Sequence, residues 1–237
     1  MPLNSSADIK ANTDKKKEKG GNYIVFECAD RFSINTKGLC KIWKGKLFYS
    51  FNARAWKEWG GEKISGKKIY FRGLNNTQIA GYNVYNNYMW VITSQNNSGV
   101  KCTGNIENLL DYKLVEKGIH PAMAGYCFTD MFNGCKNLIK GPDLPATNLS
   151  QYCYMRMFSR TGLIESPVLP AETLITYCYG DMFNDCKSLK KAGNILAENV
   201  SNSSQVYHMF NSCSSLKIRQ RLFYGLFSLF SSKAYKR

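Results

Sequence analysis

The sequence has no long hydrophobic run. Its longest apolar stretch, Leu222 to Phe230, is nine residues long and contains Gly225 and Ser228. A membrane-spanning helix needs about 20 apolar residues, so none is expected. The first 21 residues also lack the apolar core of a secretory signal and are polar, which predicts a disordered basic arm over 1–21.

Residues that carry catalysis or bind metals are also scarce. There are two histidines, His120 and His208, and the nine cysteines include no Cys-x-x-Cys pair that could hold zinc. The sequence contains neither Gly-x-Ser-x-Gly nor His-Glu-x-x-His. We therefore expect no enzyme activity, no catalytic residue, no metal and no cofactor.

Acidic residues are few, with 17 Asp and Glu against 32 Lys and Arg, and the formal charge is +15. The excess is uneven: residues 1–21 carry +2, 22–104 carry +8, 105–216 carry −1 and 217–237 carry +6. Nearly half the chain is thus neutral. Nucleic acid is a disfavoured partner, because a nucleic-acid-binding protein needs its charge clustered on one face.

The second half of the chain contains a repeat. Met-Phe occurs at Met131, Met157, Met182 and Met209, at intervals of 26, 25 and 27 residues. Other positions recur in the same phase, including a Tyr-Cys-aromatic triplet before Met-Phe, a cysteine after it and a later Leu-Pro-Ala segment. These positions include Cys127, Cys135, Cys153, Cys178, Cys186 and Cys213, then Leu138, Leu163, Leu189 and Leu216.

A unit of about 26 residues cannot bury its apolar side chains alone, so the copies are predicted to stack around a shared core. The Tyr-Cys-aromatic to Cys stretch has helical or 3₁₀ spacing and should turn Cys, Met and Phe inward. The Leu-to-Leu-Pro stretch should be extended, because proline disfavours helix at the residue before it. Pro145 and Pro170 are expected to end these strands.

The Met-Phe-x-x-Cys-x-x-Leu and Leu-Pro-Ala-x-x-Leu pattern resembles the BspA-like leucine-rich-repeat family of bacterial surface proteins. The match covers roughly residues 102–216. The resemblance implies a leucine-rich-type solenoid and a non-catalytic surface, adhesion or host-recognition module, of a kind that phages also encode.

Residues 22–104 contain short β-rich runs separated by Gly and Asn clusters, which is typical of a small antiparallel β-sandwich. The runs are Tyr23–Phe26, Lys46–Phe51, Lys68–Phe71 and Tyr88–Thr93. The strands are expected to continue into the repeats through Val100–Ile106. The predicted fold is therefore β-rich, with a β-sandwich over 22–104 and a short leucine-rich-type solenoid of about 26-residue repeats over 105–216.

Candidate binding residues lie in both parts. Beside the predicted strands of the repeats, we expect exposed side chains at Lys140, Asp143, Glu165, Val168, Lys190 and Lys191. All four tryptophans lie in residues 22–104, and core packing is the simplest role for most of them. The closely spaced Trp56 and Trp59 are the best candidates for a partly exposed aromatic site.

Two features leave alternatives open. The cysteines in phase with the repeat favour buried free thiols, although the matching Cys127–Cys135 and Cys178–Cys186 spacings also permit bridges within a coil. The basic, amphipathic tail 217–237 is either a cap on the last coil, a helix in peripheral contact with an anionic membrane, or sequence foreign to the repeats.

The leading hypothesis is a non-catalytic protein for surface recognition or adhesion that binds a protein or glycan on a cell surface through the solenoid face. The alternative is a phage virion or cell-envelope assembly component whose repeats are a protein–protein scaffold. Either one predicts a cell-surface, extracellular or virion location, while the absence of a signal peptide in this sequence keeps the cytoplasm as a further alternative.

Overall fold

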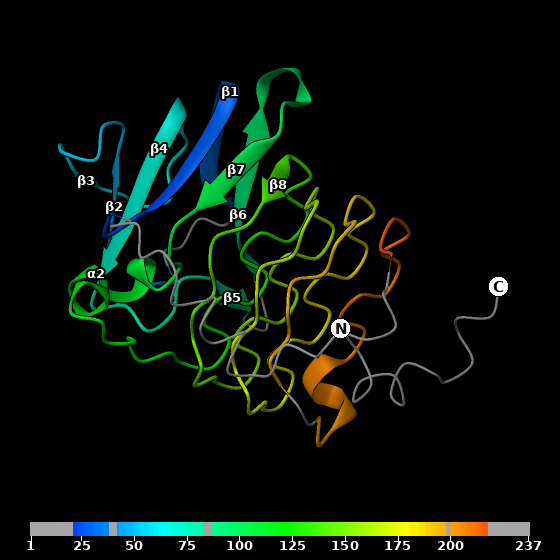
Figure 1. Ribbon diagram of the computed structural model, residues 1–237. Helices are drawn as coiled ribbons and strands as arrows, with labels where there is room; N and C mark the ends of the chain where they lie inside the picture. Colours follow the sequence, from blue (N-terminus) through cyan, green and yellow to red (C-terminus); the bar gives the residue numbers. More distant parts are fainter. Residues whose placement is uncertain (1–20, 38–41, 83–86, 198–199, 218–237) are drawn as a thin grey trace, which may run out of the picture.

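The structure is a computed structural model that describes residues 21–37, 42–82, 87–197 and 200–217. Figure 1 shows a sheet at one end and coils that follow one another away from it in chain order. Apart from Gly21 and Lys217, the predicted arm 1–21 and tail 217–237 lie outside the described residues.

The chain is β-rich, as predicted, and the strands of its described residues belong to one open mixed sheet of eight. The order is β3-β2-β4-β1-β6-β5, and β7 pairs with both β1 and β8. The strands are β1 (Ile24–Lys37), β2 (Lys46–Ser50), β3 (Lys57–Glu58), β4 (Ile64–Leu74), β5 (Gly81–Tyr82), β6 (Asn87–Ser94), β7 (Val100–Thr103) and β8 (Leu138–Lys140).

The long strand β1 organises the sheet. One of its edges pairs with β4. Its other edge pairs first with β7, at Val25–Glu27, and then with β6, at Phe32–Lys37. A bulge between Glu27 and Phe32 shifts the register between these two parts, and such bulges bend a strand and increase its twist. The four β-rich runs seen in the sequence lie in β1, β2, β4 and β6, with different bounds.

The predicted sandwich of two sheets is not confirmed, since the strands of the described residues form a single sheet. The first coil of the repeats covers its apolar face. The Phe132 ring lies 6.0 Å from that of Phe26 and 6.1 Å from that of Trp90. The backbone N–H of Trp90 also donates to the Met131 carbonyl oxygen at 2.7 Å. The sheet and the repeats therefore share one core.

A short helix, α2 (Asn108–Glu116), packs on β4 at Gly73. A Cβ atom on Gly73 would lie 1.7 Å from the Leu109 carbonyl oxygen, so only glycine permits this approach. The helix is interrupted at Asp111, whose φ of −151° is not helical. The Asp111 carboxylate accepts from the N–H groups of Lys113 and Leu114 and so caps the second segment.

Four coils follow, over residues 126–151, 152–176, 177–202 and 203–217. The first three begin with a run of turns rather than a helix, whereas the last begins with the 3₁₀ segment η2 (Ser203–Val206). The helical alternative predicted for these runs is therefore wrong. The 3₁₀ alternative is half right: alternate N–H groups bond three residues back, as those of Thr129 and Met131 do.

The remaining N–H groups of these runs bond to the next coil. Those of Phe128, Asp130 and Phe132 donate to carbonyl oxygens of the second coil at 2.8–3.0 Å. Every fourth residue has a positive φ, which aims these groups along the stack. The positions are Tyr126, Asp130 and Gly134, then Tyr152, Arg156 and Arg160, then Tyr177, Asp181 and Asp185.

Inside the coils, equivalent side chains of successive coils stack on one another. The rings of Phe132, Phe158, Phe183 and Phe210 follow at 5.7, 5.7 and 5.3 Å between centroids. The cysteines and methionines in phase with the repeat are buried as well. The predicted inward orientation of Cys, Met and Phe is thus confirmed.

The sheet runs directly into the extended side of the coils, as the sequence predicted for Val100–Ile106. Strand β7 pairs with β1 antiparallel and with β8, in the first coil, in parallel. Beyond β8, the backbone N–H of Ile164 donates to the Ile139 carbonyl at 3.2 Å, and the backbone N–H of Lys190 donates to the Ile164 carbonyl at 2.8 Å. Isolated parallel bridges continue the pattern at Glu165 and Lys191.

The eight described cysteines are free thiols. Seven are buried, whereas Cys28 is partly exposed. Burial raises the pKa of Cys135 and Cys213 to about 12 and that of Cys178 to about 11. It also raises the pKa of Cys102, Cys127, Cys153 and Cys186. Since the thiolate is the reactive form, these thiols are inert at neutral pH in the folded protein.

We expect iodoacetamide at pH 7.5 to alkylate Cys28 while the seven buried cysteines react only after unfolding. Peptide mapping by mass spectrometry, with and without guanidinium, would measure this. Rapid alkylation of Cys153 or Cys178 in the native protein would contradict the buried arrangement.

Phe158 lies between two stacked rings and is fully buried. Phe158→Ala should lower the free energy of unfolding by about 3–5 kcal/mol, because it leaves a cavity in the shared core. Phe51→Ala is the control, since Phe51 is 52% exposed and should change stability by less than about 0.5 kcal/mol. Urea unfolding followed by circular dichroism would compare them.

Candidate interaction surfaces

The six predicted side chains beside the strands of the repeats are all exposed, as expected: Lys140, Asp143, Glu165, Val168, Lys190 and Lys191. They lie on the extended side of the coils, where backbone pairing continues the sheet. Their exposure is confirmed, whereas their role in binding stays a prediction.

The structure adds that this side of the coils continues onto the sheet. Cross-strand pairing places Lys68 of β4 beside Glu27 of β1, Glu27 beside Lys101 of β7, and Lys101 beside Lys140 of β8. Paired residues in adjacent strands project from the same face. In the next two coils, Glu165 of the second pairs with Lys191 of the third. We call these residues the charged row: Lys68, Glu27, Lys101, Lys140, Glu165 and Lys191.

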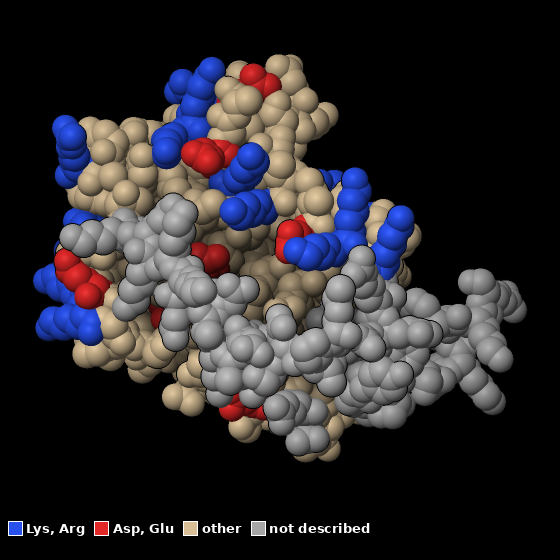
Figure 2. Space-filling model, viewed as in Figure 1, with Lys and Arg blue, Asp and Glu red and all other residues tan. Residues whose placement is uncertain are grey.

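Ion pairs neutralise the two ends of the charged row but not its middle. Lys68 Nζ lies 3.4 Å from a Glu27 carboxylate oxygen, and Lys191 Nζ lies 2.6 Å from one of Glu165. Among the described residues, no ion pair joins an acid to Lys101 or Lys140. Figure 2 shows basic and acidic side chains close together on this face, over the strands and the neighbouring coils.

Apolar side chains accompany the charges. Ile164 is 45% exposed and Val168 is 40% exposed, and both lie in the second coil, one residue before and three residues after Glu165. Buried interface centres are depleted in charge and surrounded by polar groups, so this combination of apolar and charged groups suits a protein contact.

The two tryptophan candidates differ. Trp59 is fully buried, lies 5.7 Å from Trp43 in a stacked arrangement, and donates from Nε1 to the Glu62 carbonyl at 2.8 Å. The prediction that it is partly exposed is therefore wrong: its indole fills the apolar side of the sheet. Trp56 is partly exposed, as predicted, and contacts Arg72 of β4.

A second set of charged side chains lies on the turn side of the coils, at the residue before Met-Phe. In successive coils this residue is Asp130, Arg156, Asp181 and His208, which alternate in sign when the histidine is protonated. This alternation was not predicted from the sequence. A comparison of the residue before Met-Phe in all four repeats would have revealed it.

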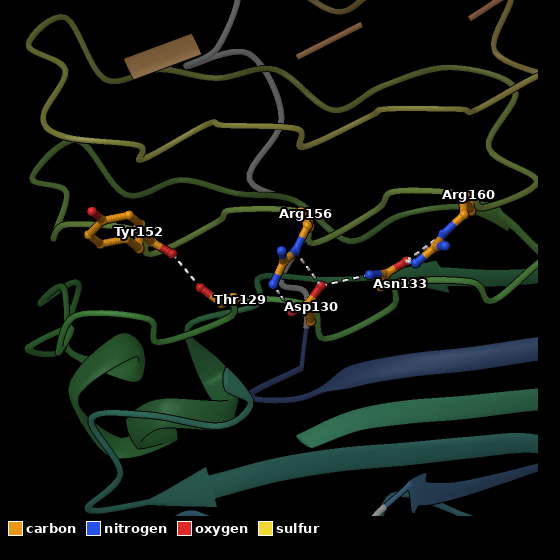
Figure 3. A network of polar contacts seen from close by, with 6 residues as sticks. All are labelled: Thr129, Asp130, Asn133, Tyr152, Arg156 and Arg160. Carbon is orange, nitrogen blue, oxygen red and sulfur yellow. Dashed lines mark hydrogen bonds and ion pairs between the residues drawn. The ribbon is translucent and has the colours of Figure 1, made fainter. Parts of the chain in front are cut away.

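Asp130 and Arg156 form the strongest pair of this set. The Arg156 Nε and Nη2 atoms donate to the two Asp130 carboxylate oxygens at 2.9 and 2.6 Å (Figure 3). Asn133 Nδ2 also donates to Asp130 at 2.6 Å, and Arg160 donates to the Asn133 amide oxygen. The Asp130 side chain is fully buried, so the pair is a structural bridge between two coils.

The other end of this set is weaker. Asp181 is half-buried, and the loss of hydration raises the pKa of its carboxyl group, although nearby His208 and Arg156 oppose the shift. His208 Nδ1 lies 3.9 Å from an Asp181 oxygen, and half of the His208 side chain is exposed. Bonding therefore weakens from the first coil to the last.

The second histidine pairs with a buried acid. His120 Nδ1 lies 2.9 Å from both carboxylate oxygens of Glu107, whose side chain is buried. Within the residues that the structure describes, no group of three or more His, Cys, Asp or Glu side chains could hold a metal ion. No helix in this part of the chain is long and apolar enough to cross a membrane.

No protein-family model, curated protein or solved structure matches the chain. The resemblance of the Met-Phe repeat to the BspA-like family therefore stays a prediction. The function has to be inferred from the surfaces themselves.

Removing the arginine of the Asp130–Arg156 pair would leave a buried carboxylate without its counter-charge. We expect Arg156→Ala to lower the free energy of unfolding by about 2–4 kcal/mol, somewhat less than for a fully buried pair because 35% of the Arg156 side chain is exposed. Arg160→Ala, which removes an exposed neighbour, should cost less than about 1 kcal/mol. Equal losses for the two variants, measured by urea unfolding, would contradict the bridge.

Proposed function

We propose that this protein is a non-catalytic recognition module that binds a protein or glycan on a cell surface. Its coils form a leucine-rich-type solenoid, and the extended side of that solenoid, together with the charged row, is the binding surface. The observation that carries the proposal is the continuity of exposed, regularly spaced side chains from the sheet across the coils.

Backbone pairing supports this role because it fixes the positions of the side chains. Adjacent strands lie about 4.8 Å apart, so charges on neighbouring strands form a row with a constant spacing. Rigid side-chain positions reduce the entropy lost on binding. An extended partner with its own repeat suits such a row better than a small molecule does.

The charges of the row indicate what the partner offers. Lys101 and Lys140 are adjacent, exposed and without an ion-paired acid among the described residues. Acidic groups on a partner would be attracted there, whereas the ends of the row are neutralised internally. The expected location is a cell surface, the extracellular medium or a virion.

The second candidate is an assembly component of a phage virion or cell envelope, with the repeats as a protein–protein scaffold. The exposed Ile164 and Val168 favour it, because apolar groups beside charges suit a permanent contact. Light scattering coupled to gel filtration separates the two candidates. A strictly monomeric protein at high concentration would speak against self-assembly.

To test the recognition surface, we would probe glycan and peptide arrays with the wild type and with Lys101→Glu/Lys140→Glu. The double variant should bind its target at least about tenfold more weakly, because two attractive contacts become repulsive. Lys63→Glu/Lys117→Glu is the matched control, with the same charge change at exposed sites away from the row. Silence of the folded wild type on both arrays, or equal losses in the two variants, would reject the proposed surface.

A further inference from the structure

Arg72 lies in an unusual environment on the outer face of β4. The centre of its guanidinium group is 4.1 Å from the Trp56 ring centroid and 4.2 Å from the Tyr112 ring centroid. Trp56 precedes β3, and Tyr112 belongs to α2, so three separate segments meet here. Rings at both of these distances make favourable cation–π contacts and restrict the guanidinium group.

This guanidinium group has no polar partner in the described part of the chain. Its Nε atom is buried without a hydrogen-bond partner. By contrast, Arg31, Arg156 and Arg160 all donate to oxygen atoms within hydrogen-bond distance. A partly desolvated donor group without a hydrogen-bond partner lowers the stability of the folded protein. The presence of such an arginine between packed aromatic rings therefore requires an explanation.

The neighbouring acids are already engaged. Glu58, across the sheet from Arg72, lies 3.1 Å from Lys46 Nζ, and Glu27 pairs with Lys68. The Asp111 carboxylate, one residue before Tyr112, accepts from three backbone N–H groups. Arg72 therefore carries a positive charge for which the described residues provide no counter-ion.

Aromatic side chains extend the site. Tyr23 lies 6.1 Å from Trp56 and 5.0 Å from Tyr70, measured between ring centroids. These three side chains and Tyr112 are all partly exposed. The site thus combines a guanidinium group held between two rings with solvent-exposed aromatic surfaces and phenolic hydroxyl groups.

We propose that Arg72 is the anion-binding residue of a glycan site whose ligand is a carboxylate-bearing sugar. The planar guanidinium group offers parallel N–H donors that match the two oxygens of a carboxylate. The exposed rings beside it offer apolar surface to the C–H faces of a sugar ring. Trp56 and Tyr112 flank the arginine, and Tyr23 and Tyr70 extend the ring surface beyond Trp56, which favours a sugar acid over an isolated inorganic anion.

This site goes beyond the proposed function, because it does not use the unpaired lysines of the charged row. It lies on the sheet, and its ligand would be bound even if Lys101 and Lys140 recognised nothing. The double variant Lys101→Glu/Lys140→Glu should therefore retain binding at Arg72, which separates the failure of one proposal from that of the other.

Tryptophan fluorescence provides a direct measurement. Trp43, Trp59 and Trp90 are buried, so a ligand at Arg72 should change mainly the emission of Trp56. The full chain would be titrated with galacturonic acid oligosaccharides and, separately, with the same oligosaccharides after reduction of their carboxyl groups. Sulfated oligosaccharides, inorganic phosphate and an acidic peptide would complete the set.

We expect the carboxylate oligosaccharide to bind roughly ten- to a hundredfold more tightly than its reduced form, the ratio for loss of hydrogen bonds to a charged group. Arg72→Met should lose the same factor, and Arg72→Lys most of it, because lysine keeps the charge but not the paired donors. Arg54→Met, an exposed arginine before Trp56, is the control and should bind like the wild type.

Three results would overturn the proposal: no binding of the carboxylate oligosaccharide, equal binding of its reduced form, or unchanged affinity in a folded Arg72→Met variant. Equal binding of sulfated sugars or phosphate would show a general anion site instead, and preference for the acidic peptide would show a protein partner. If Arg72→Met does not fold, Arg72→Lys and the shift of the Arg72 Nε–H resonance on adding ligand decide the question.

Discussion

The structure depends on how the backbone N–H groups of the turns are satisfied. In each of the first three coils they alternate, one bonding within the coil and the next bonding to the following coil. This requires a positive φ at every fourth residue, which tyrosine, aspartate and arginine adopt here as well as glycine. A positive φ is costly for such residues, so the bonds between coils must hold it in place. The coils therefore form as a stack, and each depends on its neighbours.

The stack aligns equivalent residues of successive coils in rows. These rows have different roles inside the stack, on its turn side and on its extended side. Inside, phenylalanine rings and thiols fill the core. On the turn side, Asp130 and Arg156 link two coils through a buried pair whose main effect is on stability. On the extended side, Lys140, Glu165 and Lys191 reach solvent. The interior and turn-side rows leave few groups for a partner. We therefore assign recognition to the extended side and to the sheet that continues it.

Much of this could be predicted from the repeat. A phase shared by many positions predicted the stack, the inward Cys, Met and Phe, and the exposure of Lys140 and its equivalents. The helical reading of the turns failed because spacing alone cannot distinguish bonds within a coil from bonds between coils. The sandwich was not confirmed because alternating strands show that a face is buried but not what buries it, and Phe132 of the first coil does so here. The burial of Trp59 could not be predicted for the same reason, because a tryptophan near lysines in the sequence can lie either on the surface or in the core.

By itself, the sequence determined the β-rich character, the period of the repeat and the division of charge along the chain, because these follow from residue type and spacing. Only the tertiary structure decided which residues meet. It joined the sheet to the coils through β7 and aligned Lys68, Glu27 and Lys101 with the lysines of the coils. It also placed Trp56 and Tyr112 on either side of Arg72. The physical reason is that strand pairing and side-chain packing connect residues 16 to 74 positions apart, and no local pattern records such contacts.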